Sequence, residues 1–381
     1  MMVKRTQTPG VKGSTLELLV SGGERIQSIP GLLFALLLLG VAMIATRITW
    51  PAAWLLWGFF LLDWSLMAGL PTLKISYGPA KPPTLLLAIL RVLFSLFPSP
   101  WIWVLQSMGT LLVVYAFWIE PQRLVVTKQH LSTEKLDLLT PIRILHFGDL
   151  HIERITKRER ELIERAQSLE PHLILFSGDI LSYSYVDDGI AQQEARALLS
   201  QLAANQTVYA VAGSPPVDRI DILGMIYDDL EITLLDTTRV QLQVGGNQVT
   251  LTGLPCTHDP DHDGAELMKF PPVSKESFDI LLYHSPDLAP KAAELDYDLQ
   301  LSGHTHGGQI RIPLIGALYT SSLLGKRYEA GRYEVGDMTL YVTRGLGMEG
   351  KAAPRVRFLC PPEIVLWEIM GEKSESEKPI H

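Results

Sequence analysis

Cysteine is scarce in this sequence and acidic residues outnumber basic ones, and both features exclude classes of function. The chain has only Cys256 and Cys360, which form neither a paired metal-binding motif nor a disulfide framework. Its 33 lysines and arginines stand against 41 aspartates and glutamates, so the formal net charge is −8. Nucleic-acid-binding domains generally carry a basic face, and the composition therefore predicts no nucleic-acid partner.

Hydrophobic residues make up 47% of the 381 residues, and they are concentrated before residue 120. A polar, basic segment at residues 1–28 precedes a region, residues 29–119, that we predict to contain about four transmembrane helices. A cleaved signal peptide is the alternative, but the apolar stretch starts late and a second one follows closely. The four apolar runs cover residues 30–46, 50–70, 84–97 and 101–118, and the third is short enough to be re-entrant or interfacial.

Two charged residues, Asp63 and Arg91, lie inside the apolar runs. Charges in membrane segments are costly and are usually paired, so one hypothesis is an ion pair between the second and third helices. An arginine that extends to the membrane interface is the alternative. The distribution of lysine and arginine around the runs predicts an integral protein of the plasma (inner) membrane with its large C-terminal domain in the cytoplasm. An odd number of spans would place that domain outside.

From about residue 120 the pattern changes to short apolar runs that alternate with helical segments, which is typical of a layered α/β domain. We expect this domain at residues 120–370, followed by a charged tail at 371–381. Helices are expected at 157–169 and 191–204, and a hairpin at 241–252. Strands are expected at residues 142–147, 172–177, 207–212, 278–283, 297–301, 340–343 and 363–368.

Aspartates and histidines follow several of the expected strands directly, where the carboxyl ends of neighbouring strands converge on one crevice. These residues are Asp149, His151, Asp179, His284, His304 and His306. Two carboxylates and four imidazoles form a mixed oxygen and nitrogen set that suits manganese, iron or zinc better than calcium. Taken singly, the aspartates fit turns and His284 fits a strand end, but turn chemistry does not explain the whole set. We expect the other histidines outside the site: His258 and His262 as solvated loop residues, and His130, His146 and His172 as structural residues.

The ordered blocks Gly148-Asp149-Leu150-His151, Gly178-Asp179, His284 and Gly303-His304-Thr305-His306 resemble the calcineurin-like metallophosphoesterases. Residues 307–309 and 341–347 are similar to the membrane-anchored branch of that family, which includes bacterial enzymes that hydrolyse UDP-2,3-diacylglucosamine. The resemblance covers roughly residues 120–370 and implies a four-layer α/β/β/α sandwich with two divalent metal ions. It also implies the ligands: Asp149, His151 and His306 at one ion, Asp179 as a bridge, and His284 and His304 at the second.

One block departs from the family. The family has Gly-Asn-His followed by Asp or Glu after the strand at 207–212, whereas this chain has Gly213-Ser214-Pro215-Pro216. Ser214 thus stands at the position of a metal-binding asparagine, and Pro215 stands at the position of the histidine that assists phosphoryl transfer. Ser214 could still offer its hydroxyl as a ligand, or water could fill the gap. Asp218 or His258 could also reach the site, but nothing in the sequence shows it.

Two functions remain open. The first is a membrane-bound, metal-dependent phosphoesterase or pyrophosphatase that hydrolyses a lipid-linked or nucleotide-lipid substrate with a hydroxide activated by two metals. The predicted helices favour it, because they would hold the site near the lipid headgroups. The alternative is a catalytically weakened relative that serves as a membrane-bound sensor or scaffold, and the altered block at Ser214-Pro215-Pro216 favours this.

Overall fold

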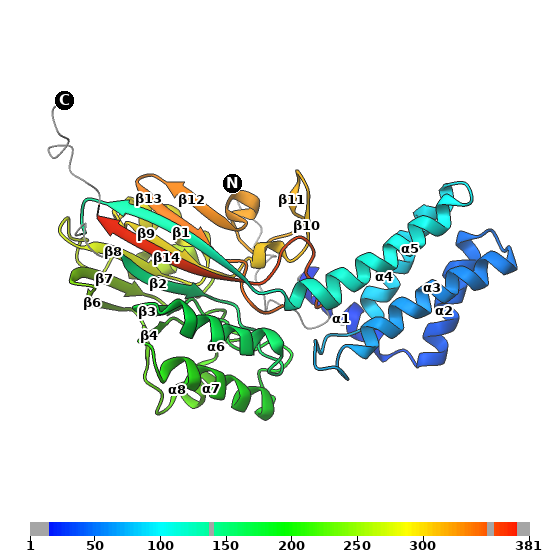
Figure 1. Ribbon diagram of the computed structural model, residues 1–381, viewed down its shortest axis with the longest axis horizontal. Helices are drawn as coiled ribbons and strands as arrows, with labels where there is room; N and C mark the ends of the chain where they lie inside the picture. The colour runs from blue at the N-terminus through cyan, green and yellow to red at the C-terminus, as the bar shows by residue number, and fades with distance from the viewer. Residues whose placement is uncertain (1–14, 137–140, 349–353, 372–381) are drawn as a thin grey trace. The chain divides into compact units, whose positions relative to one another are not determined.

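A computed structural model describes residues 15–136, 141–348 and 354–371 of the chain. The chain divides into two compact units, a helical unit of residues 1–122 with 349–358 and a unit of residues 123–348 with 359–381 that contains the sheets. Figure 1 shows the helices and strands of each unit. Each unit has its own hydrophobic core.

The helical unit contains α1 (Thr15–Ser28), α2 (Gly31–Ala45), α3 (Trp50–Gly69), α4 (Lys81–Arg91) and α5 (Trp101–Val114), with a 3-10 helix at Val92–Leu96. Two helices of the described residues are long and apolar enough to cross a membrane, α3 and the continuous segment Trp101–Gln122 that starts with α5. A third span exists only if Ser21–Ser28 and Gly31–Ala45, bent by 107°, act together. The expected number of about four spans is therefore not reached, because α2 has 15 residues and α4 has 11, fewer than the roughly 17–25 that a span needs.

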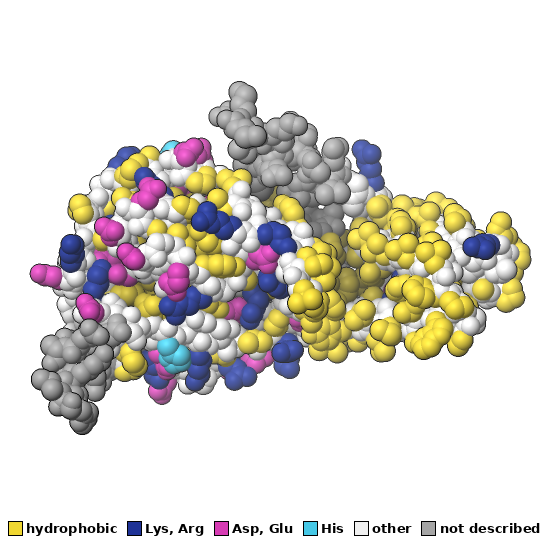
Figure 2. Space-filling model, turned by 90° about the horizontal axis from the view of Figure 1, so that it is seen from above, with side chains coloured by type: hydrophobic (Ala, Val, Ile, Leu, Met, Phe, Trp, Pro, Cys, Tyr) yellow, Lys and Arg dark blue, Asp and Glu magenta, His cyan; other side chains and the backbone are white. Residues whose placement is uncertain are grey.

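The outer surface of the helical unit is mostly apolar. Figure 2 shows hydrophobic side chains over most of its visible face, whereas the other unit displays interspersed charges. Large side chains such as Leu36, Leu62 and Leu111 are about half exposed or more. A contiguous apolar surface of this kind is typical of a region that contacts a membrane or another protein.

The hypothesis of an ion pair between Asp63 and Arg91 is confirmed. The Arg91 guanidinium lies 2.8 Å from the Asp63 carboxylate, and both side chains are almost fully buried. Thr110 of α5 joins the pair: its hydroxyl accepts from Arg91 at 3.1 Å and donates to Asp63 at 2.8 Å. The pair thus connects α3, α4 and α5 within the helical unit.

The second unit is built on two six-stranded sheets. The first has the order β1-β14-β2-β3-β4-β5, with β1 (Val125–Thr133), β14 (Glu363–Gly371), β2 (Ile142–Phe147), β3 (Leu173–Phe176), β4 (Val208–Ala210) and β5 (Ile232–Leu234). The second has the order β12-β13-β9-β8-β7-β6, with β12 (Gly331–Val335), β13 (Met338–Val342), β9 (Leu299–Ser302), β8 (Phe278–Leu282), β7 (Asn247–Gly253) and β6 (Thr238–Val244). The expected hairpin is the antiparallel pair β6–β7, in which Val244 is opposite Asn247.

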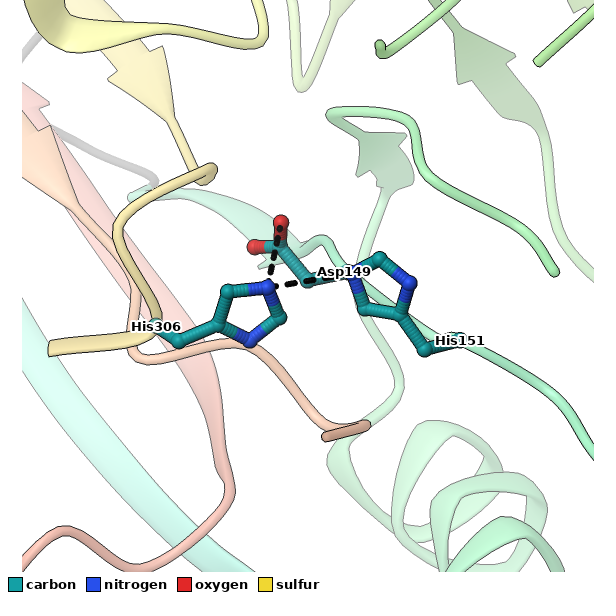
Figure 3. Close-up of side chains that lie close together, drawn as sticks. All are labelled: Asp149, His151 and His306. Atoms are coloured by element: carbon teal, nitrogen blue, oxygen red, sulfur yellow. Dashed lines mark hydrogen bonds and ion pairs between the residues drawn. The ribbon is translucent and has the colours of Figure 1, made fainter. Parts of the chain in front are cut away.

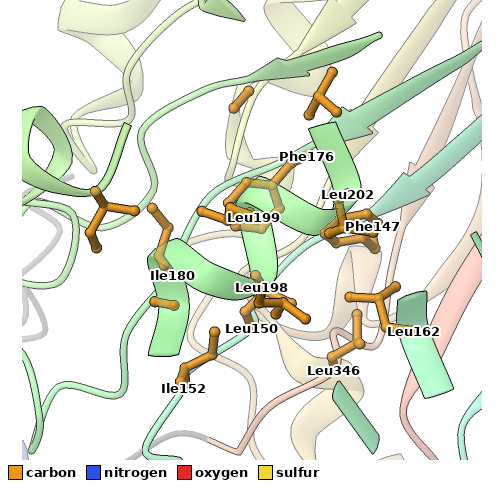
Figure 4. Close-up of a cluster of buried hydrophobic side chains, with 14 of the residues drawn as sticks. Phe147, Leu150, Ile152, Leu162, Phe176, Ile180, Leu198, Leu199, Leu202 and Leu346 are labelled. Atoms are coloured by element: carbon orange, nitrogen blue, oxygen red, sulfur yellow. The ribbon is translucent and has the colours of Figure 1, made fainter. Parts of the chain in front are cut away.

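Three hydrophobic clusters show that the unit has four layers. In β2, Ile142 and Ile144 face the second sheet, while Leu145 and Phe147 face helices, as expected for a strand whose side chains alternate. The helices on that face are α6 (Lys157–Leu169), α7 (Gly189–Ala203) and α8 (Ile220–Tyr227), and Figure 4 shows part of this cluster. On the far face of the second sheet, α9 (Pro260–Leu267) and α10 (Ala289–Glu294) pack on β8 and β13. The α/β/β/α sandwich is therefore confirmed.

Local sequence explains where α6 begins. Thr156 accepts a hydrogen bond from the backbone of Arg158, and Glu159 reaches back to the Thr156 backbone N–H at 2.8 Å, which completes a capping box. The helix then runs from Lys157 to Leu169, as the sequence predicts. Its buried residues Leu162 and Ala166 belong to the same hydrophobic cluster as Leu150, which lies between Asp149 and His151.

Candidate metal centre

The loops that follow five strands meet at one edge of the sandwich. Asp149 and His151 follow β2, Asp179 follows β3, and the loop after β4 carries Ser214. From the second sheet, His284 follows β8, and His304 and His306 follow β9. Within each sheet these strands are parallel, so their carboxyl ends lie at the same edge.

The backbone of the site is unusual in conformation. Positive φ angles occur at Asp149 (53°), His151 (40°), Asp179 (61°), His304 (71°) and His306 (52°). A left-handed conformation is uncommon for residues other than glycine, and strain of this kind concentrates at functional sites. Five of the six residues selected from the sequence therefore have side chains aimed by a costly backbone conformation.

The first group consists of Asp149, His151 and His306, whose potential ligand atoms all lie within 4.8 Å of one another (Figure 3). The Nε2 atoms of the two histidines are 3.0 Å apart, and Nε2 of His306 is 3.7 Å from Oδ1 of Asp149. The Nδ1 atom of His151 lies 3.2 Å from the carbonyl oxygen of Leu181. If Nδ1–H donates to that carbonyl, the lone pair of Nε2 is directed into the group.

The second group consists of Asp149, Asp179 and His284, again within 4.8 Å. Nε2 of His284 is 3.3 Å from Oδ2 of Asp179, while its Nδ1 lies 2.8 Å from the carbonyl oxygen of Ser177. Because Asp149 belongs to both groups and Asp179 also lies 3.6 Å from Nε2 of His151, the two groups are neighbours. Five of the six residues selected from the sequence are brought together in this way.

His304 differs from the other five. Its backbone N–H donates to Asp149 at 2.9 Å, and its ring is buried with its centroid 5.1 Å from that of His284. Among the described residues, however, His304 is in neither of the two groups defined by ligand-atom distance. Its role as a ligand stays a prediction.

Ser214 occupies the place at which the family has asparagine. Its hydroxyl donates to Oδ2 of Asp179 at 3.1 Å and lies 3.3 Å from Nε2 of His284. The Asp218 carboxylate has a structural role instead, because its two oxygens accept hydrogen bonds from the backbone N–H groups of Asp179, Ile180 and Gly213. Asp218 therefore fixes the loops after β3 and β4.

His258 is not a solvated residue, contrary to the expectation from the sequence. Its ring is partly buried, 4.6 Å from the His304 ring and 6.3 Å from the His284 ring between centroids. His262, four residues on, is as expected: its side chain is 59% exposed and pairs with Asp263. The aspartate-rich composition of the segment concealed this difference.

Burial dominates the electrostatics of the site. It raises the pKa of Asp149 to about 6, although the imidazole of His284 opposes that rise. Burial would also raise the pKa of Asp179, but the adjacent His284 and His151 hold it well below its ordinary value. For His284 burial would lower the pKa, but Asp179 outweighs it and raises the pKa to about 10. Burial, and then His258, lower the pKa of His304.

The donor chemistry fits divalent metal ions. Buried carboxylates and imidazoles that face one another at 3.0–3.7 Å are expensive to hold together without a cation between them. The mixture of oxygen and nitrogen donors matches manganese, iron or zinc. The number of two ions is implied by the resemblance and stays a prediction, as does the identity of the metals.

Comparison with known proteins gives consistent results. Residues 142–308 match the model of a family described as calcineurin-like phosphoesterase. The metallophosphoesterase YkuE of Bacillus subtilis is 30% identical over 67% of this chain and 88% of its own length. The phosphodiesterase YaeI of Escherichia coli is 31% identical over 67% of this chain and 92% of its length, and a metallophosphoesterase of Aquifex aeolicus is 27% identical over 67% and 95%.

Proposed function

The chain belongs to the calcineurin-like phosphoesterase family and is a hydrolase of that family, and on this premise we propose that it is a membrane-bound phosphodiesterase or pyrophosphatase with a lipid-linked substrate. The observation that carries the proposal is the buried set of carboxylates and imidazoles at the edge of the two sheets. Two helices that are long and apolar enough to cross a membrane support the lipid-linked substrate, and so does an exposed apolar hairpin that follows His306 in the chain.

In this proposal Asp149, His151 and His306 would hold one divalent ion, Asp179 would bridge, and His284 and His304 would hold a second. Bound divalent ions would neutralise phosphate oxygens and provide a hydroxide at neutral pH. The chain positions the donors: backbone carbonyls orient the rings of His151 and His284, and the His304 N–H orients Asp149. Rigid donors of this kind need no reorganisation during the reaction.

Pro215 favours substrates whose leaving group departs easily. Proline has no side-chain donor, so the residue at this position cannot protonate the departing oxygen as a histidine would. Loss of a general acid typically slows a reaction by about 10²–10⁴-fold. A pyrophosphate or an aryl phosphate, whose leaving group is already a weak base, would be affected least.

An apolar hairpin directly follows the His306–Gly308 turn. It consists of β10 (Arg311–Ile312) and β11 (Gly316–Ala317). Leu314 at its tip is 107% exposed, and Ile315 and Leu318 are more than half exposed. Exposure of large apolar side chains to water is unfavourable, whereas their packing against acyl chains is favourable. The hairpin therefore supports a lipid-linked substrate. The bias of lysine and arginine in the sequence favours a cytoplasmic position for the sandwich.

The test uses the full chain in lipid nanodiscs with manganese. Hydrolysis of a bis-aryl phosphate and of UDP-2,3-diacylglucosamine is measured for the wild type, Asp179→Ala and the exposed control Asp261→Ala. We expect both substrates to be hydrolysed by the wild type and the control, and neither by Asp179→Ala. Hydrolysis of the aryl phosphate alone would refute the lipid-linked substrate, and metal binding without any turnover would favour the sensor alternative.

A further inference from the structure

We propose that His258 is a further ligand of the second metal position, beside His284 and His304. The inference rests on the proposed metal-dependent function, and it adds a residue that the ordered sequence blocks do not contain. His258 comes from the loop after β7, which pairs in parallel with β8, so this loop leaves the sheet at the same edge as His284. The backbone N–H of Cys256 donates to the carbonyl of Ala212 at 3.3 Å, which holds the loop beside the Ser214 loop.

The imidazole of His258 has one nitrogen that is buried without a partner. Its Nδ1 lies 3.6 Å from the Cys256 thiol, while its Nε2 is shielded from solvent and has no hydrogen-bond partner in the described part of the chain. Leaving a buried polar atom unsatisfied costs about 1–3 kcal/mol. The residue also has a φ of 61°, a conformation that is rarely kept without a functional reason. Both costs are explained if Nε2 binds a ligand.

The neighbours of His258 identify that ligand as a cation. Its ring faces His304 and His284 rather than a carboxylate, with centroid distances of 4.6 Å and 6.3 Å. Clustered imidazole rings gain little from one another, but imidazole is the commonest nitrogen ligand of transition metals. A cation bound at this position would account for the cluster.

The three rings are neighbours, but their nitrogens do not converge in this structure: among the described residues, His258 and His304 are in neither group whose ligand atoms all lie within 4.8 Å. Two imidazoles that bind an ion at about 2.1 Å with an angle of about 90–110° have centroids roughly 4.6–5.3 Å apart. The distances are 4.6 Å for His258–His304 and 5.1 Å for His284–His304. The longer His258–His284 distance of 6.3 Å means that the His258 ring has to turn for its Nε2 to reach the same ion as His284.

The other candidate ligand side chains in this region already have hydrogen-bond or ion-pair partners. Both carboxylate oxygens of Asp218 accept backbone hydrogen bonds, so that side chain is not available. His262 is exposed and paired with Asp263. Ser214 offers a single short hydroxyl, which already donates to Asp179. His258 is therefore the residue that can add a strong donor to this position.

Metal content of the full-length protein tests the proposal without reference to turnover. The wild type, His258→Ala and the matched control His262→Ala are equilibrated with Mn²⁺, and the bound ions are counted by mass spectrometry. We expect about two ions in the wild type and the control, and a second ion that binds at least about 10–100-fold more weakly in His258→Ala. Cobalt-substituted His258→Ala should also lose the part of the visible absorption that arises from the second metal position. Two ions bound to His258→Ala with wild-type affinity would overturn the proposal.

A second variant protects the test against simple misfolding. Adding Ser214→Asn to His258→Ala puts an amide oxygen near Asp179 and His284, where the Ser214 hydroxyl now lies. We expect the second ion to return in this double variant. If His258→Ala loses ions and the double variant does not recover the second one, the loss is structural and the proposal is rejected. A wild type that binds no ion would instead reject the proposed metal-dependent function.

Discussion

Replacing Gly303 by alanine tests whether the position of the Asp149 carboxylate controls the metal centre. A Cβ atom at residue 303 would lie 2.3 Å from Oδ2 of Asp149, whereas ordinary contacts begin at 3.4 Å. The carboxylate or the loop must therefore move by about 1.1 Å, the difference between these distances. The backbone N–H of His304 donates to both oxygens of Asp149 at 2.9 and 3.2 Å, so the movement also disturbs the loop that carries His304 and His306.

The expected effect is large on activity and moderate on stability. A misplacement of about 1 Å in a catalytic centre costs about 10²-fold in rate. An extra methyl group in a tightly packed region costs about 1–3 kcal/mol of unfolding free energy. We therefore expect Gly303→Ala to stay folded, to bind metal more weakly and to hydrolyse a bis-aryl phosphate about 10²-fold more slowly.

Gly224→Ala is the matched control. Gly224 lies inside α8, and a Cβ there has nothing within 4 Å. Alanine in a helix interior is favoured over glycine by about 1 kcal/mol, so this variant should keep its activity and unfold at a slightly higher temperature. Turnover, manganese content and thermal unfolding are compared for both variants. Wild-type turnover and metal content in Gly303→Ala would refute the argument that this contact positions Asp149.

Three further predictions follow from other contacts in the structure. Asp63→Ala should cost about 3–5 kcal/mol, because the Arg91 charge stays buried without its partner; strictly additive losses in a double-mutant cycle with Arg91→Ala would show that the pair is not coupled. Leu314→Ser with Ile315→Ser should reduce hydrolysis of a vesicle-borne lipid substrate more than hydrolysis of a soluble aryl phosphate, and equal reductions would argue against a role of the hairpin in lipid contact. For Glu159, burial would raise the pKa, but Arg158 and Thr156 outweigh it and lower the pKa below the ordinary 4.5. Its contribution to stability is thus present above about pH 4.5 and lost as the pH falls through the lowered value, so the difference in Tm between wild type and Glu159→Gln should shrink on acidification.

The strands that carry the site were predictable because their side chains alternate between two apolar environments. β3 is apolar throughout and β2 is interrupted only by Arg143 and His146, which gives the nearly continuous apolar runs typical of buried parallel strands. The donors then follow where each run ends. Sequence reasoning therefore found Asp149, Asp179 and His284 without knowing how the sheets pack.

Elements with weaker local signals were not predicted. β1 is an edge strand whose burial alternates between half-buried and exposed, and it forms by pairing with β14 more than 200 residues later in the chain. α8 has only eight residues, and α9 lies in the aspartate-rich stretch interpreted as a loop. β1 is stabilised by a partner that is distant in sequence, and α8 and α9 by packing in the hydrophobic clusters, rather than by local propensity.

The spans were overcounted for a related reason. Apolar composition identifies segments that avoid water, but it does not say how far each helix continues. The third run forms α4 and then changes to a 3-10 helix at Val92–Leu96, and α2 ends at Ala45. Asp63 and Arg91 were paired correctly because the cost of an isolated charge leaves few alternatives.

The altered block at Ser214 and Pro215 leads to one conclusion from the sequence and to another from the structure. Along the chain it removes two side chains that the family uses, which suggests a weakened enzyme. In space, the Ser214 hydroxyl still lies within 3.3 Å of both Asp179 and His284, and His258 approaches the same position from a loop more than 40 residues later in the chain. A donor set depends on where atoms meet and not on their order in the chain, so the lost asparagine does not by itself imply a lost ion. The missing histidine is not replaced in the same way, because a residue that binds a metal ion cannot also protonate the leaving group. Its absence limits the range of substrates and leaves the metal site unchanged.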